Sequence, residues 1–202
     1  MNGLAMHVKD NIPVIGIDDS PFDFREDKFT LIFGVVIKGH SIIENILSAK
    51  IKVDDVTPSL TSSIASMIDQ CDQKTHLKAI LLNGITFGGF GIVDLAWLFK
   101  LVEIPVIAVV DHQPDYQRIK KSLLENFSDG KDRWNTAKRN GEPDPMVLND
   151  KIIYYQYQGI SREIVEKIIK KTTRSRYTQP EAIRIAHFIG TSLQRSTGKN
   201  KR

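Results

Sequence analysis

The amino-acid sequence predicts an α/β protein built around one mixed sheet. Three β-rich segments stand near the start of the chain, and between residues 77 and 127 strand and helix patterns alternate. Antiparallel strands can be joined by a tight hairpin, whereas parallel strands need a crossover connection. The first group therefore predicts antiparallel strands and the second predicts parallel ones. We expect a single domain, residues 1–202, because this length lies below the size at which cores usually divide.

The antiparallel part is predicted from three segments. Residues 14–17 are short, apolar and followed at once by the acidic pair 18–19, which predicts a buried strand that opens into a polar loop. Residues 29–38 and 42–53 are the other two β-rich segments. Because Gly39 lies in the short link between them, we expect a hairpin turn there.

The alternating part is predicted from the spacing of apolar residues. Residues 57–71 carry apolar side chains at helical intervals, with a proline at the start, which favours a helix. Buried strands are expected over 78–82 and 105–110, separated by a glycine-rich loop, 84–91, and a helix, 92–101. This loop lacks the spacing of known phosphate-binding glycine motifs, so we interpret its glycines as a tight strand-to-helix connection.

The C-terminal third is expected to end in helices. Residues 128–150 are rich in Gly, Asp, Asn and Pro, which predicts a long surface loop. A strand is expected over 152–157, a helix over 161–172, and a last helix from Pro180. Residues 196–202 have no apolar anchor and are expected to form a frayed basic tail.

The composition excludes several classes of protein. Hydrophobic residues make up 41% and charged residues 26% of the chain, a balance typical of a folded protein rather than a disordered one. The single cysteine, Cys71, excludes a disulfide scaffold and a thiolate zinc centre. No apolar run is long enough to span a membrane, and the first residues lack the pattern of a signal peptide. We therefore expect a cytoplasmic protein with no membrane partner.

Positive charge is concentrated in the second half of the chain. The whole sequence has a net charge of +4, but residues 102–202 hold 19 Lys and Arg against 12 Asp and Glu. Such an excess favours a polyanionic partner such as nucleic acid, DNA or RNA. The alternative is a solvated basic face with no partner. The oligomeric state is left open.

Oxygen-bearing side chains stand at the ends of the predicted strands. Asp18, Asp19, Asn83 and Asp111 all fall there. Ligands of mixed and parallel sheets gather at the carboxyl ends of the strands, and hard oxygen donors suit Mg²⁺ or Mn²⁺. The alternative is that these side chains only solvate loops and cap turns. His187, in the last predicted helix, is interpreted either as a packed side chain or as part of the same site.

Four segments together resemble a known family. They are residues 14–22 (VIGIDDSPF), 81–90 (LLNGITFGGF), 105–115 with its QPD ending, and 180–187 (PEAIRIAH). In this order they resemble an archaeal domain-of-unknown-function family, number ninety-nine, that is similar to endonuclease V. The match runs from about residue 12 to residue 198. Endonuclease V itself is a more distant relative, most similar over residues 159–187.

The resemblance implies a ribonuclease H-like fold, with a mixed five-stranded sheet of three antiparallel strands followed by parallel ones. In that fold the first and fourth strands are neighbours, so that Asp18 and Asn83 would face each other across a metal site. Endonuclease V has carboxylates at both positions and cuts a strand near inosine with Mg²⁺. Asp55 is the chosen counterpart of the intermediate acidic ligand, and His187 matches a histidine near the active site of some relatives.

Asn83 departs from the family, which usually has aspartate there. An amide keeps one oxygen ligand but removes a full negative charge, which weakens Mg²⁺ binding and the activation of water. The leading hypothesis is metal-dependent phosphodiester hydrolysis, with Asp18, Asp55 and Asn83 as ligands and His187 as an auxiliary proton-transfer or phosphate-contacting group. The alternative is a non-catalytic nucleic-acid-binding module with a degenerate metal site. A nucleotide-binding enzyme that uses the glycine-rich loop is a third, weaker possibility.

Overall fold

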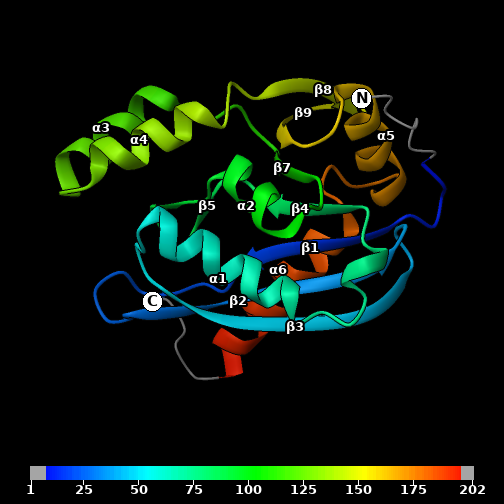
Figure 1. The fold of residues 1–202 in the computed structure, drawn as a ribbon, viewed down its shortest axis with the longest axis horizontal. Coiled ribbons are helices and arrows are strands. Elements are labelled where there is room, and N and C mark those ends of the chain that lie inside the picture. The colour runs from blue at the N-terminus through cyan, green and yellow to red at the C-terminus, as the bar shows by residue number, and fades with distance from the viewer. Residues whose placement is uncertain (1–7, 197–202) are drawn as a thin grey trace.

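A seven-stranded mixed sheet runs through the computed structural model, which describes residues 8–196 (Figure 1). The strand order is β3-β2-β1-β4-β7-β9-β8. The strands are β1 (Pro13–Asp19), β2 (Phe29–Lys38), β3 (Ile42–Lys52), β4 (Ala79–Asn83), β7 (Val106–Val110), β8 (Asp144–Leu148) and β9 (Lys151–Gln158). Two short strands, β5 (Thr86–Phe87) and β6 (Gly91–Ile92), pair antiparallel and form a separate small hairpin.

The predicted pairing of the sheet is confirmed. β1 pairs antiparallel with β2, and β2 pairs antiparallel with β3. β1 also pairs parallel with β4, and β4 pairs parallel with β7. The sheet has seven strands rather than five, because β9 adds antiparallel to β7 and carries β8 at the far edge.

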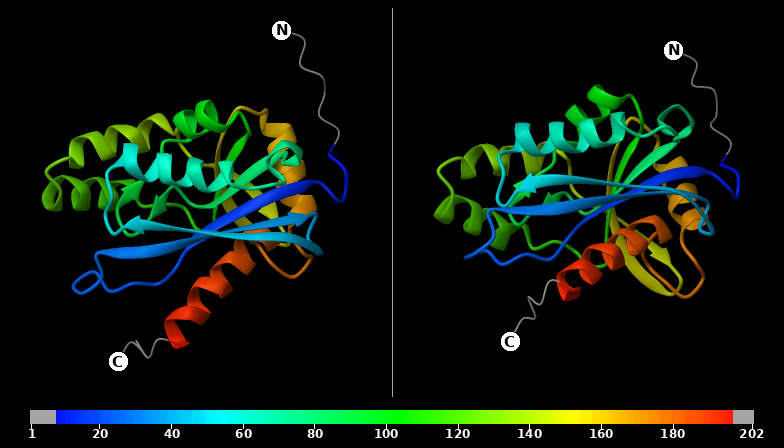
Figure 2. Two further views of the ribbon diagram at one scale, coloured as in Figure 1. Left: turned by 60° about the horizontal axis from the view of Figure 1, so that its bottom comes forward. Right: turned by 90° about the horizontal axis from the view of Figure 1, so that it is seen from below.

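Helices cover both faces of the sheet. They are α1 (Thr57–Asp69), α2 (Leu95–Val102), α3 (Tyr116–Asn126), α4 (Gly130–Arg139), α5 (Arg162–Thr172) and α6 (Glu181–Ser196), and a short 3₁₀ turn spans Lys74–His76. The two views of Figure 2 place α1 on one face and α6 on the other. No helix among residues 8–196 has the length and apolar character needed to cross a membrane. The predicted tail over 196–202 lies outside the described residues, apart from Ser196, where α6 ends.

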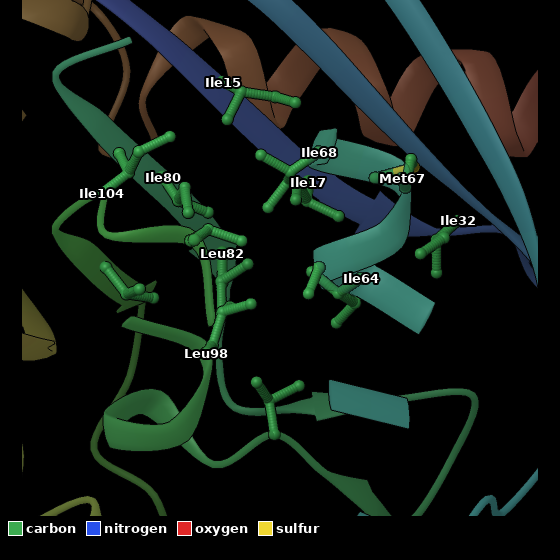
Figure 3. Packing of buried hydrophobic residues seen from close by; sticks show 14 of the residues in the cluster. Ile15, Ile17, Ile32, Ile64, Met67, Ile68, Ile80, Leu82, Leu98 and Ile104 are labelled. Atoms are coloured by element: carbon green, nitrogen blue, oxygen red, sulfur yellow. The ribbon is translucent and has the colours of Figure 1, made fainter. Parts of the chain in front are cut away.

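Alternation along β1 divides the core into two layers. Ile15 and Ile17 belong to the core shared with α1 and α2, which Figure 3 shows. Val14 belongs to the core shared with α5 and α6, and Gly16 lies directly against the start of α6. Because successive side chains of a strand point to opposite faces, Asp18 continues on the α6 face and Asp19 on the α1 face. The alternation therefore separates the two acidic side chains at the end of β1.

The prediction of a surface loop over residues 128–150 is wrong, because α4 and β8 lie within it. Although α4 is mostly polar, its residue Arg133 is buried, with only 3% of its surface exposed. Its guanidinium donates to the Asp129 carboxylate at 2.8 Å and to the backbone oxygens of Phe90 and Asp54 at 2.8 and 2.7 Å. The bonds to Phe90 and Asp54 fix α4 to the β5–β6 turn and to the segment before α1, both of which are far away in the sequence.

Candidate functional site at the ends of the parallel strands

Asp18 lies at the centre of a polar cluster near the end of β1. Its side chain is buried, with 3% of the residue exposed. Oδ1 accepts hydrogen bonds from Asn83 Nδ2 and from the backbone N–H of Asp19, both at 3.0 Å. The contact with Asn83 follows from the parallel pairing, which ends with Ile17 beside Leu82 and so places the next residue of each strand side by side. The predicted juxtaposition of Asp18 and Asn83 is therefore present.

His187 reaches the same carboxylate from α6. Its Nδ1 lies 2.9 Å from Asp18 Oδ2, and half of its side chain is exposed. A carboxylate accepts, so Nδ1 carries the proton of this bond and Nε2 is left for another partner. Burial raises the pKa of Asp18, and the hydrogen bonds from Asn83 and His187 oppose that rise. A half-exposed imidazole held by a buried carboxyl group is suited to exchange protons with a bound ligand.

Gln179 extends the cluster and was not predicted from the sequence. Its Nε2 donates to Asn83 Oδ1 at 2.9 Å, so that Gln179, Asn83, Asp18 and His187 form one hydrogen-bonded series. Next to it, Thr178 donates to Asp111 Oδ1 at 3.0 Å. The segment from Thr178 to His187 therefore touches the ends of β7, β4 and β1 in turn. The only feature of the sequence that could have pointed to Gln179 is its position directly before Pro180, where the last helix was expected to begin.

Asp19 lies apart from this series, on the α1 face. Its Oδ2 accepts a 2.6 Å hydrogen bond from the backbone N–H of Gly88 in the β5–β6 turn. Gly88 has a φ of 59°, so the glycine permits the left-handed turn that presents this N–H. Burial, together with the nearby charge of Asp18, raises the pKa of Asp19 to about 6. The Asp19 carboxyl thus connects β1 to the glycine-rich loop.

Asp19→Asn is expected to stabilise the metal-free protein above pH 6. With its folded-state pKa raised to about 6 from 3.8, Asp19 makes the free energy of unfolding fall as pH rises from about 4 to about 6 and then level off. The full effect is at most about 2–3 kcal/mol. Urea unfolding in EDTA at pH 4.5 and pH 8 measures it. The same pH dependence in the wild type and in the variant would contradict a raised pKa of Asp19.

The structure does not bring Asp55 to Asp18. Asp55 lies just before α1, where Oδ1 accepts from the backbone N–H of Val56 at 2.9 Å and Oδ2 accepts from Ser59 Oγ at 2.7 Å. These bonds stabilise the first turn of α1, and Asp55 does not form a metal-binding group of three with Asp18 and His187 within residues 8–196. The role of Asp55 as a metal ligand stays a prediction.

The donor set suits a shared metal ion rather than a protein cage. Within the described residues, no three His, Cys, Asp or Glu side chains are grouped to hold a metal. Asp18 offers a carboxylate, and Asn83 offers an amide oxygen that now accepts from Gln179. Mg²⁺ commonly binds one or two carboxylates and completes its shell with water and substrate phosphates. The chemistry of Asp18 and Asn83 fits an ion of that kind.

A cavity of about 500 Å³ adjoins Asn83 on its β7 side. It lies between the sheet and the α3–α4 hairpin, which projects from one end of the molecule (Figure 1). Its walls are largely apolar and include Phe90, Val110 and Ile119, and the buried amide of Gln156 also lines it. This volume and this lining are typical of a site for a small organic group.

The basic residues of α5 and the loop after it are partly neutralised within the chain. Lys167 pairs with Glu163 at 2.6 Å, Arg174 pairs with Glu181 at 3.3 Å, and Lys171 pairs with Asp10. Exposed lysines also stand on the α3–α4 hairpin beside the cavity, at positions 120, 121, 131 and 138. Exposed positive charge outside α5 therefore lies in part on this hairpin, which the sequence did not single out.

Comparison with known proteins identifies the relatives. The chain is 36% identical over 190 residues to a UPF0215 protein of Methanosarcina barkeri, covering 94% of each chain. A solved protein of unknown function from Archaeoglobus fulgidus superposes with a TM-score of 0.79 at 28% identity, over 90% of this chain and 97% of that one.

The fold is shared with endonuclease V. The enzyme of Ciona intestinalis, solved with a 24mer DNA containing an inosine followed by a ribo-adenosine, superposes with a TM-score of 0.61 at 15% identity, over 93% of this chain and 87% of that one. This likeness confirms the predicted ribonuclease H-like fold. The family model described as endonuclease dU matches residues 10–194. The chain therefore belongs to the endonuclease dU family, in agreement with the resemblance found in its sequence.

Proposed function

We propose that this protein hydrolyses phosphodiester bonds of nucleic acid at the Asp18 cluster, with Mg²⁺ or Mn²⁺ bound there. The observation that carries the proposal is the meeting of Asp18, Asn83 and His187 at the ends of β1 and β4. The name of the family, endonuclease dU, and the inosine-containing DNA bound by a relative of the same fold support nucleic acid as the substrate. Ligands of such sheets bind at the same edge.

Each residue of the cluster has a role that follows from its contacts. Asp18 and Asn83 would hold the metal ion through oxygen atoms, and such an ion, when bound, polarises a phosphate and lowers the pKa of bound water. Asp18 also orients the imidazole of His187 through the 2.9 Å contact with Nδ1. Nε2 has no hydrogen-bond partner among residues 8–196 and the side chain is half exposed, so His187, when protonated at both ring nitrogens, can pass the Nε2 proton to the departing oxygen while Nδ1 stays bonded to Asp18.

The adjoining cavity would hold a base lifted out of its stack. Enzymes that act at a particular base commonly extrude it into a pocket lined by apolar side chains. The cavity is large enough for a nucleobase and adjoins Asn83, a member of the proposed cleavage site. Lysines of the α3–α4 hairpin would contact phosphates on that side.

The test is cleavage of end-labelled oligonucleotides that carry a single dU, a single inosine or neither. Wild-type protein is assayed on single- and double-stranded forms with Mg²⁺, with Mn²⁺ and with EDTA. We expect cleavage that needs the metal and the modified base. Absence of cleavage under every condition would contradict the proposal.

Asn83→Asp is expected to raise the affinity for Mg²⁺ by about tenfold or more, because a second carboxylate would face the ion. Calorimetric titration of the metal into both proteins measures this change. Asn126→Asp, which adds the same charge at an exposed position of α3, is the matched control and should leave the affinity unchanged. Equal affinities for Asn83→Asp and the wild type would remove Asn83 from the metal site.

One observation favours a second function, binding without cleavage. Asn83 supplies no charge, and its oxygen is already bonded to Gln179. A protein of this second kind would bind oligonucleotides with an affinity that falls steeply as salt rises, and it would cut none of them. The cleavage assay combined with a salt titration of binding separates the two functions.

A further inference from the structure

We propose that Gln156 selects the base in the cavity beside Asn83, by accepting a hydrogen bond from the ring N–H that uracil and hypoxanthine carry and that cytosine and adenine lack. This inference rests on the proposed function, since it assumes that the cavity holds a base of the substrate. It assigns the selection of that base to one side chain of β9. Three features of Gln156 carry the argument.

The first feature is its position. Gln156 pairs with Ala108 of β7, and both residues line the cavity. Gln156 is only 6% exposed, although glutamine is usually a surface residue. A neutral amide buried in a largely apolar cavity provides a polar contact of fixed direction. Such contacts generally set the orientation and specificity of a ligand.

The second feature is that hydrogen bonds hold the side-chain amide of Gln156 in one of its two possible orientations. Its Nε2 donates to the backbone oxygen of Gly141 at 2.6 Å and lies 3.2 Å from the hydroxyl oxygen of Tyr116. A backbone carbonyl can only accept, so the nitrogen, and not the oxygen, must face Gly141. Both N–H groups of the amide are therefore engaged. The remaining polar atom, Oε1, is an acceptor in a fixed place.

The third feature is that this acceptor is free. Oε1 of Gln156 has no hydrogen-bond donor within residues 8–196. The fully enclosed side-chain atoms that lack a partner in the same range are the hydroxyls of Ser20, Thr57 and Thr191. Oε1 is not among them, so it is not fully enclosed, and the residue that carries it lines the cavity. A ligand with a suitably placed N–H would satisfy it.

Deamination of cytosine or adenine changes the ring nitrogen that an acceptor of this kind would contact. Cytosine has a lone pair at N3, whereas uracil has an N–H there, and adenine and hypoxanthine differ in the same way at N1. A fixed acceptor binds the N–H and repels the lone pair. Sites built around a buried hydrogen bond reject partners that cannot make it far better than apolar pockets reject a change in size. Gln156 would thus separate uracil from cytosine and hypoxanthine from adenine.

The test measures binding without cleavage. Asp18→Asn protein is titrated with fluorescent single-stranded oligonucleotides that contain one dU, one dC or one N3-methyl-dU at the same position. We expect dU to bind about tenfold or more tightly than dC and N3-methyl-dU. Adding Gln156→Leu should reduce both ratios to less than about twofold. Gln158→Leu, a change on the same strand outside the cavity lining, is the matched control and should keep both ratios.

Two results would overturn the role of Gln156. One is tight binding of N3-methyl-dU, a comparison that needs no variant at Gln156 and does not depend on its folding. The other is a folded Gln156→Leu protein that still prefers dU over dC. Failure of the proposed function would give a different result. A protein that prefers dU through Gln156 but never cleaves would contradict the proposed hydrolysis and would leave the role of Gln156 intact. Thermal melting shows whether each variant is folded.

Discussion

Asp18→Asn is expected to slow cleavage by about 100-fold or more, because loss of a metal ligand should exceed the 10–100-fold losses typical of outer-shell partners. Asp18 offers the only carboxylate bonded to both Asn83 and His187 among the described residues. An asparagine keeps the size of the side chain and removes its charge. Single-turnover cleavage of a dU oligonucleotide in Mg²⁺ measures the change.

The same variant should remain folded, which separates loss of chemistry from loss of structure. Burial disfavours the charged form of Asp18, so a neutral side chain should leave the free energy of unfolding at pH 8 at least as high as in the wild type. Asp72→Asn, an exposed acid in the turn after α1, is the control and should cleave normally. If Asp18→Asn cleaves at the wild-type rate, the active site lies elsewhere.

Gly16→Ala is expected to lower the free energy of unfolding by about 3 kcal/mol or more. A Cβ at this position would lie 2.4 Å from the backbone carbon of Ala182 and from the backbone nitrogen of Ile183. Those atoms belong to α6, so the whole helix must move to relieve the contact. For a chain of this size the loss corresponds to a fall in Tm of roughly 6–12 °C.

Gly34→Ala is the matched control for this prediction. A Cβ at Gly34 would meet the ends of the Ile15 and Met67 side chains, at 2.9 and 3.1 Å, and flexible side chains can give way. Its cost should be well below that of Gly16→Ala. Because α6 also carries His187, Gly16→Ala should reduce cleavage as well as stability. Equal melting temperatures for the two variants would contradict the close contact between β1 and α6.

The sequence predicted the central part of the fold because local pattern and burial agree there. The strand over residues 14–17 is buried and apolar, and the helix over 57–71 has apolar side chains at regular spacing, so each could be recognised from its own residues. α4 could not, because Arg133 anchors it through atoms of Phe90 and Asp54 that are distant in the chain. Helices held by such polar contacts leave little periodic signal.

The same distinction applies to the candidate site. Asp18 and Asn83 were predicted to meet because adjacent parallel strands bring their ends together, and they do. Gln179 and Gln156 were missed, since a neutral amide belongs to no motif and acquires a role only from the groups that face it. Asp55 was chosen for its place after a strand; its hydrogen bonds are local ones at the start of α1, and its role as a metal ligand stays a prediction.

The most direct test of the metal site is anomalous diffraction from crystals of the protein grown with Mn²⁺ and a dU oligonucleotide bearing a non-hydrolysable phosphate. We expect a manganese peak within coordination distance of Asp18 and Asn83 oxygen atoms and of a phosphate oxygen, at the distances usual for oxygen ligands. An oligonucleotide bound with its phosphates and manganese away from Asp18 would contradict the site proposed for this chain.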